Sequence, residues 1–427
     1  MALSGSPSRF ERKPKTQKRV VVTGVGVLSP VGNDAESTWK ALREGKSGIA
    51  RISKFDPTGF DCQIAGEVKG FNCDNYVPKK EQRRMDLFIQ YSMATAQMAI
   101  ENSRIPLERL QSPRAGVIVG AGIGGLPGIE DTHNVLRDRG PSRISPFFIP
   151  MVISNLASGQ IGIRYGTKGP NFCVVSACAT GAHSIGEAAK YIRDGICDVM
   201  IAGGSESTVC PLAIGGFGAM KALSTRNEQP TEASRPFDQG RDGFVLGEGS
   251  AILILEEYEY AEKRGAPILA ELSGYGLSCD AHHMTNPSPG GDGAVRSMQM
   301  ALKDAGLDPS EIGYVNAHGT STPVGDEIET QAIKTVFGED AKKTPVSSTK
   351  SMTGHLLGAA GSLESVICIL ALRDQVVPPT INLENPSAVC DLDYVPWTSR
   401  ATKIQHALNN SFGFGGTNCS VIFSRPE

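Results

Sequence analysis

Cys178 is the first residue whose setting suggests chemistry. In CVVSACATGAHSIGEAAKYI (173–192), an apolar β-branched run ends at Ala177 and Cys178 opens a stretch rich in Ala and Gly. This pattern predicts a strand, a sharp turn and a helix. The unpaired N–H groups and the positive dipole end of that helix would then face the sulfur and favour thiolate over thiol. A nucleophile that accepts an acyl group is one interpretation, and a buried inert cysteine is the other.

Two histidines stand in unusual surroundings. His318 follows a short apolar run in YVNAHGTSTPVGD, and His355 lies in STKSMTGHLLGAAG, at the mouth of a helix rich in Ala and Gly. Neutral imidazoles can donate hydrogen bonds to an oxygen on which enolate charge develops. Either histidine alone would more often be a structural group. A cysteine together with two such histidines favours an active site.

The composition of the whole chain limits the class of protein that could carry this site. The 427 residues are 40% hydrophobic and 20% charged, and the formal net charge is −3. These values predict a large globular protein and give no global argument for binding to nucleic acid or to a membrane surface. The 10 cysteines include no CxxC pair, so we expect reduced thiols and no metal site. No apolar run is long enough to span a membrane.

The first 18 residues, MALSGSPSRFERKPKTQK, are basic and polar and lack apolar periodicity. We expect residues 1–18 to form a disordered leader. The leader is either a tail or the remnant of an organellar transit peptide. The compartment is therefore the cytoplasm if the protein is bacterial, and a plastid or the mitochondrial matrix if the leader is a transit-peptide remnant.

Buried strands alternate with helical patterns along the chain. RVVVTGVGVLSPVG (19–32) is an apolar run before an amphipathic stretch, and further strand candidates lie at 114–122, 197–207 and 249–265. This alternation predicts an α/β fold with buried sheets. The GxG in the first run lacks the third glycine of a dinucleotide-binding loop, which argues against a nucleotide site.

The second half of the chain repeats the scheme of the first. Residues 268–280 resemble the opening strand, 344–372 resemble the strand, turn and helix around Cys178, and 409–423 resemble CDVMIAGGSES. An internal duplication divides the chain into an N-terminal half, 19–266, and a C-terminal half, 267–427. Two related halves packed face to face would bring both glycine-rich turns to one shared cleft.

Four motifs in this order resemble the β-ketoacyl-acyl carrier protein synthases of the thiolase superfamily, specifically the chain-elongating type II enzymes. They are SACATGAH with Cys178, NAHGTSTPVGD with His318, SSTKSMTGH with His355, and NSFGFGGTN with Phe412. The resemblance implies a duplicated five-layered α/β/α/β/α fold and a homodimer. It also implies that the enzyme uses no redox cofactor and no catalytic metal.

The resemblance implies a role for each motif residue in a decarboxylative Claisen condensation during fatty acid elongation. Cys178 would accept an acyl chain from acyl carrier protein. His318 and His355 would bind the malonyl thioester carbonyl and stabilise the enolate that forms as the carboxylate leaves. The backbone N–H groups of Cys178 and Phe412 would form the oxyanion hole.

Other residues match supporting positions of the family. Lys350 and Glu364 match a pair that orders the histidine region, although a lysine alone is usually a solvated surface group. Thr320 and Thr322 match residues that hydrogen-bond the phosphopantetheine arm of the carrier protein, although threonines can simply cap a turn.

The acyl chain needs an apolar tunnel, and the resemblance to the family implies which residues line it. The match places Ile123, Phe148 and Phe217 along it, with Phe412 as its gate. Without the resemblance, each of these residues would be interpreted as ordinary core.

Lys80, Arg83 and Arg84 form a basic cluster in VPKKEQRRMD, at the start of an expected helix. Such a cluster fits the docking of an acidic carrier protein. A solvated run of charges is the usual alternative.

Three rival functions remain. A coenzyme A-dependent thiolase would use a second cysteine as base, and Cys419 is the candidate, but it lies inside an expected strand and we favour a structural role for it. A polyketide-type ketosynthase would share the motifs. A non-catalytic partner subunit of a polyketide system typically lacks the nucleophile, whereas Cys178 is present.

Overall fold

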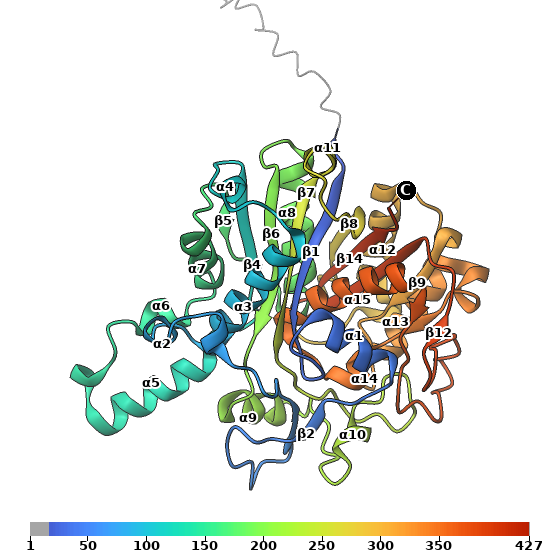
Figure 1. The fold of residues 1–427 in the computed structure, drawn as a ribbon. Coiled ribbons are helices and arrows are strands. Elements are labelled where there is room, and N and C mark those ends of the chain that lie inside the picture. The colour runs from blue at the N-terminus through green and yellow to red at the C-terminus, as the bar shows by residue number, and fades with distance from the viewer. Residues whose placement is uncertain (1–16, 427) are drawn as a thin grey trace, which may run out of the picture.

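The computed structural model describes residues 17–426, and these residues form a mixed sheet of ten strands covered by helices (Figure 1). The N-terminal half supplies one side of this sheet. There β4 runs parallel to β5 and β6, while β7 runs antiparallel to β6 and β1. The described strands on this side, from the centre outward, are β1 (Val20–Leu28), β7 (Gly249–Glu257), β6 (Val199–Glu206), β4 (Ala115–Gly120) and β5 (Asn171–Phe172).

The C-terminal half supplies the other side with the same order and the same directions. Here β9 runs parallel to β10 and β13, while β14 runs antiparallel to β13 and β8. The equivalence confirms the expected duplicated α/β fold. From the centre outward, the described strands are β8 (Ala270–Cys279), β14 (Thr417–Ser424), β13 (His406–Gly413), β9 (Ile312–Asn316) and β10 (Val346–Ser347).

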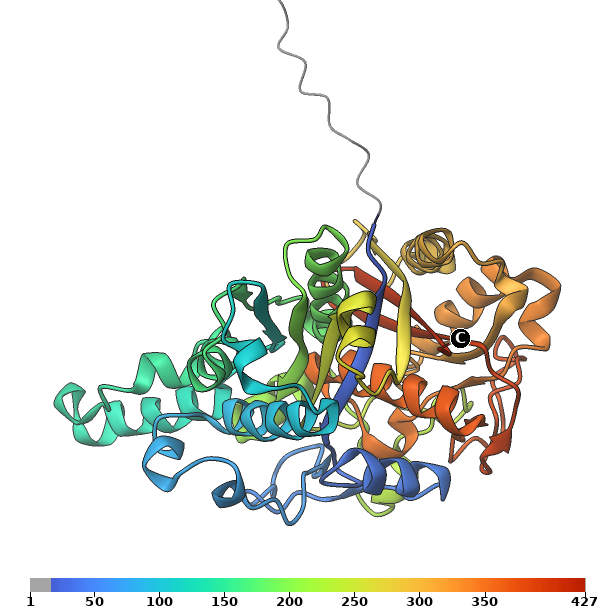
Figure 2. The same ribbon diagram turned by 45° about the horizontal axis from the view of Figure 1, so that its top comes forward.

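The two halves meet where β1 pairs with β8. The pairing is antiparallel and joins Val21 to Glu271 and Val22 to Ala270. Because this contact is so short, the two parts of the sheet are free to twist apart and to face each other across a layer of helices. Figure 2 shows these helices beside the strands of both halves.

Two equivalent helices, α8 (Thr180–Arg193) and α15 (Ala360–Asp374), form the middle layer. They pack against each other and against strands of both halves. Every residue of α15 from Ala360 to Leu372 is buried, as expected for a helix that has sheets on both sides. The outer layers include α3 (Leu87–Ser103), which packs on β1 and β7, and α12 (Asp292–Ala305), which packs on β8 and β14. This arrangement is the expected layered α/β/α/β/α fold.

The GxG of the opening strand has a packing role. All residues of β1 are buried. A Cβ added at Gly24 would lie 2.2 Å from the Ala99 carbonyl oxygen, and one added at Gly26 would lie 2.0 Å from that of Thr95. Both carbonyls belong to α3, so the two glycines let this helix approach the strand closely.

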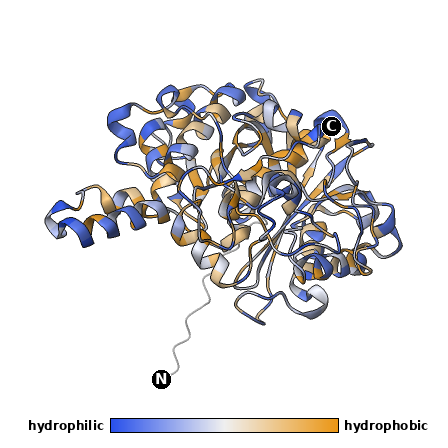
Figure 3. Cartoon of the chain, turned by 90° about the horizontal axis from the view of Figure 1, so that it is seen from below, coloured by the Kyte–Doolittle hydropathy of each residue, from blue (hydrophilic) through white to orange (hydrophobic). Residues whose placement is uncertain are grey.

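The remaining elements decorate this core. Helix α5 projects from the body of the protein, and apolar residues are interspersed along it (Figures 1 and 3). No helix among residues 17–426 is long and apolar enough to cross a membrane. The other elements are α1 (Ala35–Arg43), β2 (Ile49–Arg51), β3 (Ile64–Gly66), η1 (Cys73–Asn75), α2 (Lys79–Gln82), α4 (Leu107–Leu110), α5 (Leu126–Arg139), η2 (Pro141–Arg143), α6 (Phe148–Val152), α7 (Leu156–Tyr165), η3 (Ala177–Ala179), α9 (Pro211–Ala219), α10 (Pro230–Ala233), α11 (Tyr258–Lys263), η4 (Pro289–Gly291), η5 (Pro309–Glu311), α13 (Gly325–Phe337), η6 (Gly338–Lys342), α14 (Lys350–Thr353), η7 (Leu357–Ala359), β11 (Val376–Val377) and β12 (Arg400–Ala401).

The expected leader, residues 1–18, lies almost wholly outside the described residues, which begin at residue 17. Within it, Lys18 donates its backbone N–H to the carbonyl of Arg193 at 3.2 Å. The division of the chain into 19–266 and 267–427 stays a prediction. Residue 427 also lies outside the described part.

Candidate active site

Cys178 lies at the sharp turn expected from the sequence. Strand β5 ends at Phe172, and the turn η3 leads directly into α8. Ala177 has a φ of 48°, a left-handed conformation that residues with a side chain seldom adopt. This backbone turns Cys178 toward a cavity, and its side chain is buried, with 8% of the residue exposed.

Burial raises the pKa of the Cys178 thiol to about 12. The positive charge of Lys350 and hydrogen bonds from the backbone N–H groups of Phe414 and Cys178 act in the opposite direction, but they do not outweigh burial. Burial therefore opposes the expected effect of the helix terminus, whose N–H groups favour the thiolate. In the free enzyme, burial favours the thiol form of Cys178.

The same contacts correct the expected oxyanion hole. The backbone N–H groups that face the Cys178 sulfur belong to Cys178 and Phe414, not to Phe412. Phe412 lies on β13, where it pairs with Asn418 of β14, and the turn that approaches the sulfur begins at Phe414, after β13 ends at Gly413. The ring of Phe412 instead lies 5.8 Å from the ring of His318.

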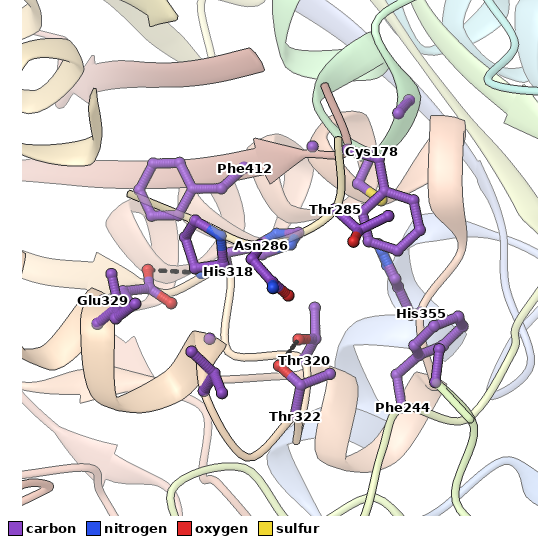
Figure 4. A pocket seen from close by; sticks show the side chains of 18 of the residues that line it. Cys178, Phe244, Thr285, Asn286, His318, Thr320, Thr322, Glu329, His355 and Phe412 are labelled. Carbon is purple, nitrogen blue, oxygen red and sulfur yellow. Dashed lines mark hydrogen bonds between the residues drawn. The ribbon is translucent and has the colours of Figure 1, made fainter. Parts of the chain in front are cut away.

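His318 and His355 come together from two different segments. His318 follows β9, and His355 lies between α14 and η7. Their ring centroids are 5.3 Å apart, with the planes nearly perpendicular (Figure 4). Nδ1 of His318 and both ring nitrogens of His355 have no hydrogen-bond partner among the described residues. These nitrogens are therefore free to bind a substrate.

Both imidazoles are held neutral. Burial, together with the positive charge of Lys350, places the pKa of His318 and the pKa of His355 well below the usual value for histidine. A neutral imidazole can still donate one hydrogen bond to a substrate oxygen. This agrees with the expectation of neutral donors at the site.

Lys350 and Glu364 form a buried ion pair behind the histidines. Lys350 opens α14 and is 1% exposed, and Glu364 lies on α15 and is 2% exposed. Burial raises the pKa of Glu364 to about 7, although Lys350 opposes this. Neither side chain lines the cavity. The pair therefore acts on the site through its electrostatic field and through packing.

A second buried carboxylate holds the His318 loop, and sequence reasoning missed it. Glu329 of α13 accepts the backbone N–H groups of His318 at 2.8 Å and of Gly319 at 2.7 Å. Burial raises the pKa of Glu329 to about 7, while these hydrogen bonds lower it. Glu329 stands eleven residues after the histidine on the next helix. Only its position on the buried face of this helix could have drawn attention to it.

One cavity of about 470 Å³ collects most of the residues selected from the sequence (Figure 4). The hydroxyl oxygens of Thr320 and Thr322 lie 3.1 Å apart at its wall. Thr285 and Asn286, which sequence reasoning missed, also line it. The selected residues that line it are Cys178, His318, His355, Thr320, Thr322, Phe412, Ile123 and Phe217.

Phe148 does not line this cavity. It opens α6 and is half-buried, next to the exposed side chains of Phe147 and Ile149. Its place along an acyl tunnel stays a prediction.

The basic cluster lies on the surface as expected. Lys80, Arg83 and Arg84 are exposed on and just after α2. The guanidinium of Arg84 lies 4.3 Å from the centre of the Phe147 ring. Neither Lys80 nor Arg83 forms an ion pair within residues 17–426. These charges are available to a partner.

Cys419 is fully buried on β14 and does not line the cavity. Burial raises its pKa well above the usual value for cysteine. This arrangement fits the structural role expected for Cys419 and leaves a thiolase without its second cysteine at the site.

Comparisons with known proteins agree with this geometry. Residues 17–261 match the family model "Beta-ketoacyl synthase, N-terminal domain", and residues 269–384 match "Beta-ketoacyl synthase, C-terminal domain". The chain is 54% identical over 412 residues to 3-oxoacyl-[acyl-carrier-protein] synthase 2 of Vibrio cholerae, covering 96% of this chain and 100% of that protein. It is 51% identical over 411 residues to the protein of the same name from Synechocystis, covering 96% and 99%.

Solved structures share the fold. A β-ketoacyl synthase from Burkholderia phymatum has a TM-score of 0.90 at 35% identity, covering 96% of this chain and 100% of that chain. A ketosynthase bound to a hexaketide, in complex with a type II PKS acyl-carrier protein, has a TM-score of 0.89 at 36% identity with the same coverage.

Proposed function

The chain belongs to the β-ketoacyl synthase family, and we propose that it is a 3-oxoacyl-[acyl-carrier-protein] synthase that extends an acyl chain by decarboxylative condensation with malonyl carrier protein. One observation carries the proposal: a buried cysteine and two neutral, unpartnered imidazoles face the same cavity. The cysteine suits a covalent acyl intermediate, and the imidazoles suit a developing enolate.

In the first step, the Cys178 sulfur attacks the acyl thioester carbonyl. A carbon–sulfur bond forms to Cys178, and the bond to the carrier thiol breaks. The backbone N–H groups of Cys178 and Phe414, which face the sulfur, stabilise the oxyanion. Because Cys178 rests as a thiol, its proton must leave as the new bond forms, and it ends on the departing carrier thiol.

In the second step, the malonyl thioester oxygen accepts hydrogen bonds from His318 and His355. The bond between the malonyl α-carbon and its carboxylate breaks, carbon dioxide leaves, and the electron pair forms an enolate. Neutral imidazoles stabilise this enolate without forming an ion pair with a carboxylate or a thiolate.

In the third step, the enolate carbon attacks the acyl thioester of Cys178. A carbon–carbon bond forms, the 3-oxoacyl product remains on the carrier protein, and the Cys178 sulfur leaves as a thiolate that takes up a proton from solvent. The N–H groups of Cys178 and Phe414 again face the carbonyl oxygen of the acyl group. The same oxyanion hole therefore serves both acyl transfers.

Supporting residues place the substrates. Thr320 and Thr322 lie at the cavity wall, where their hydroxyl groups would hydrogen-bond the phosphopantetheine arm. Ile123 and Phe217 line its apolar part, which would receive the acyl chain. Burial and the positive charge of Lys350 keep the imidazoles neutral, and Glu364 is the ion-pair partner of Lys350.

Lys80, Arg83 and Arg84 would dock the acidic carrier protein. Their exposure, and the lack of ion pairs at Lys80 and Arg83 within the described part of the chain, support this role. Reversing Arg83 and Arg84 to Glu should raise KM for the carrier substrate far more than for a small acyl thioester. Equal effects on both substrates would contradict docking at this cluster.

We also propose a homodimer. Strand β5 is an outer strand of the sheet, and several apolar side chains on α5, on α7 and at the start of α6 are exposed. These are Ile129, Leu136, Phe147, Ile149 and Ile163. Light scattering of the purified protein would test this, and a monomer at micromolar concentration would refute it.

The reaction is redox-neutral, and the phosphopantetheine arm arrives on the carrier protein. The proposal therefore includes no redox cofactor and no catalytic metal. The relatives reported above are bacterial, which favours the cytoplasm over an organelle matrix as the compartment.

Mass spectrometry tests the proposed function. The enzyme is incubated with acyl carrier proteins of graded chain length and then with malonyl carrier protein. We expect an acyl mass on the peptide that contains Cys178, followed by its loss together with formation of a 3-oxoacyl carrier two carbons longer. Activity on coenzyme A esters without release of carbon dioxide would indicate a thiolase instead.

A further inference from the structure

Glu206 is a buried carboxylate that the mechanism above does not use. It ends β6 and is fully buried. Its two oxygens accept hydrogen bonds from four backbone N–H groups. Glu206 forms no ion pair within residues 17–426. The donors are Gly122 at 2.7 Å, Gly124 at 3.0 Å, Gly358 at 3.0 Å and Ile123 at 3.2 Å.

These donors come from opposite halves of the molecule. The loop Gly122–Gly124 follows β4 and carries Ile123 into the cavity. Gly358 lies in the η7 turn, next to Leu357, which also lines the cavity, and three residues after His355. Glu206 therefore joins the acyl side of the cavity to the turn that follows a catalytic imidazole.

The junction has no free space. A Cβ added at Gly358 would lie 2.2 Å from the nitrogen of Gly122, and one added at Gly122 would lie 2.7 Å from Oε2 of Glu206. Because such distances are shorter than any van der Waals contact, only glycines fit here. The separation of the two segments is therefore set by the carboxylate between them.

Glu329 offers a comparison within the same molecule. It too accepts backbone N–H groups from the loop after an equivalent strand, β9, but both donors, His318 and Gly319, belong to its own half. Glu206 differs because Gly358 belongs to the other half. Its role extends beyond holding one loop.

We propose that Glu206 is a positioning residue that holds Ile123 at a fixed distance from the Leu357–Gly358 turn and so determines which acyl chain lengths the cavity accepts. The inference rests on the proposed function, because Ile123 affects chain length only if an acyl chain occupies this cavity.

Glu206→Gln tests the role with little change of shape. A glutamine replaces one acceptor oxygen with an NH₂ group. Its remaining oxygen can accept the N–H groups of Gly122 and Gly358, or those of Ile123 and Gly124, but not both sets. A buried N–H group without an acceptor costs about 1–3 kcal/mol, so the loop that carries Ile123 should move. Glu67→Gln is a matched control. Glu67 is buried and accepts the N–H groups of Ser53 and Lys54, but neither of these donors lines the cavity.

The measurement is kcat/KM for short and long acyl carrier substrates. For Glu206→Gln we expect kcat/KM for long chains to fall about tenfold, while kcat/KM for short chains changes little. A tenfold fall corresponds to the lower end of the cost of a buried N–H group without an acceptor. Glu67→Gln should leave the ratio of the two values unchanged. An equal fall for both chain lengths in Glu206→Gln would show a purely structural role and overturn the proposal.

A second variant guards against loss of folding. In Gly122→Ala, the added methyl group would push the Gly122–Gly124 loop away from Glu206. The ratio of kcat/KM for long chains to that for short chains should therefore shift in the same direction. An unchanged ratio in Gly122→Ala would overturn the proposal whether or not Glu206→Gln folds. If the parent enzyme condenses no acyl chain of any length, the proposed function itself fails, and that result is distinct from an unchanged ratio in an active enzyme.

Discussion

The turns that start α8 and α15 are equivalent in the two halves but differ in chemistry. Ala177 and Leu357 both have a φ of 48°, and each begins a short 3-10 turn that leads into a helix of the middle layer. The next residue is Cys178 in the first turn and Gly358 in the second. The first presents a sulfur to the cavity, whereas the second presents a backbone N–H to Glu206.

The difference shows how a duplicated fold can separate two tasks. In the proposed function, the N-terminal turn would hold the acyl group, and the segment that leads into the C-terminal turn carries His355, which would face malonyl. A side chain at position 358 would collide with Gly122, so the second turn cannot carry a nucleophile of its own. Changes to each turn should therefore affect different steps of the reaction.

The largest expected effect separates the two half-reactions. His355→Ala should lower the rate of malonyl decarboxylation by about 100- to 1000-fold, the usual cost of losing one preorganised donor. Acylation of Cys178 should survive at least in part, because its oxyanion faces the N–H groups of Cys178 and Phe414. Carbon dioxide release and acyl-enzyme mass measure the two steps. Loss of acylation with full decarboxylation would reverse the assignment, and His318→Ala should behave like His355→Ala.

The two turns should also differ in their tolerance of a methyl group. Gly358→Ala places a Cβ 2.2 Å from the nitrogen of Gly122 and should lower the free energy of unfolding by about 1–3 kcal/mol. Cys178→Ala removes one sulfur at the cavity surface and should change stability much less. Chemical denaturation of both variants would show this contrast. Equal stability of the two would mean that the turns are not packed as described.

The pH dependence of decarboxylation should depend on Lys350. In the parent, both imidazoles have pKa values well below 6.5, so they stay neutral and active as the pH falls through 6.5. Lys350→Met removes the charge that lowers these pKa values, so the acid limb of the rate profile should move to higher pH. Glu364→Gln keeps the lysine charge and should not move the limb upward. An unmoved limb in Lys350→Met would show that Lys350 does not keep the imidazoles neutral.

The smallest effect concerns the acyl side alone. Ile123→Phe adds volume to the apolar part of the cavity, which a packed wall cannot absorb cheaply. Loading of long chains should fall while short chains still load, and decarboxylation of malonyl carrier should stay close to the parent rate. Mass spectrometry across chain lengths measures this. An unchanged chain-length profile would remove Ile123 from the acyl site.

Much of this architecture could be predicted from the sequence because the two halves repeat the same local sequence patterns. Apolar runs closed by glycine identified the buried strands, and the similarity of 344–372 to the Cys178 segment predicted the equivalent helices. The motifs around Cys178, His318 and His355 brought the right side chains to one cavity.

The failures have a common physical cause, which is that burial and register are not local properties. The helix terminus at Cys178 could be predicted from the sequence, but the burial that raises the pKa of the Cys178 thiol could not. Phe412 and Phe414 are two residues apart in one glycine-rich motif, and only the end of β13 decides which of them reaches the sulfur. Glu206 accepts backbone N–H groups that are far away in sequence, and Glu329 accepts those of His318 and Gly319 across a loop, so no local motif marks either carboxylate.

Cys178→Gln gives the most direct test of the central claim that the two turns serve separate half-reactions. The glutamine amide imitates the thioester carbonyl of the acylated state, so malonyl carrier can bind but no acyl chain can load. We predict that this variant releases carbon dioxide from malonyl carrier while forming no acyl-enzyme and no 3-oxoacyl product. Complete loss of decarboxylation in a folded Cys178→Gln protein would contradict the account.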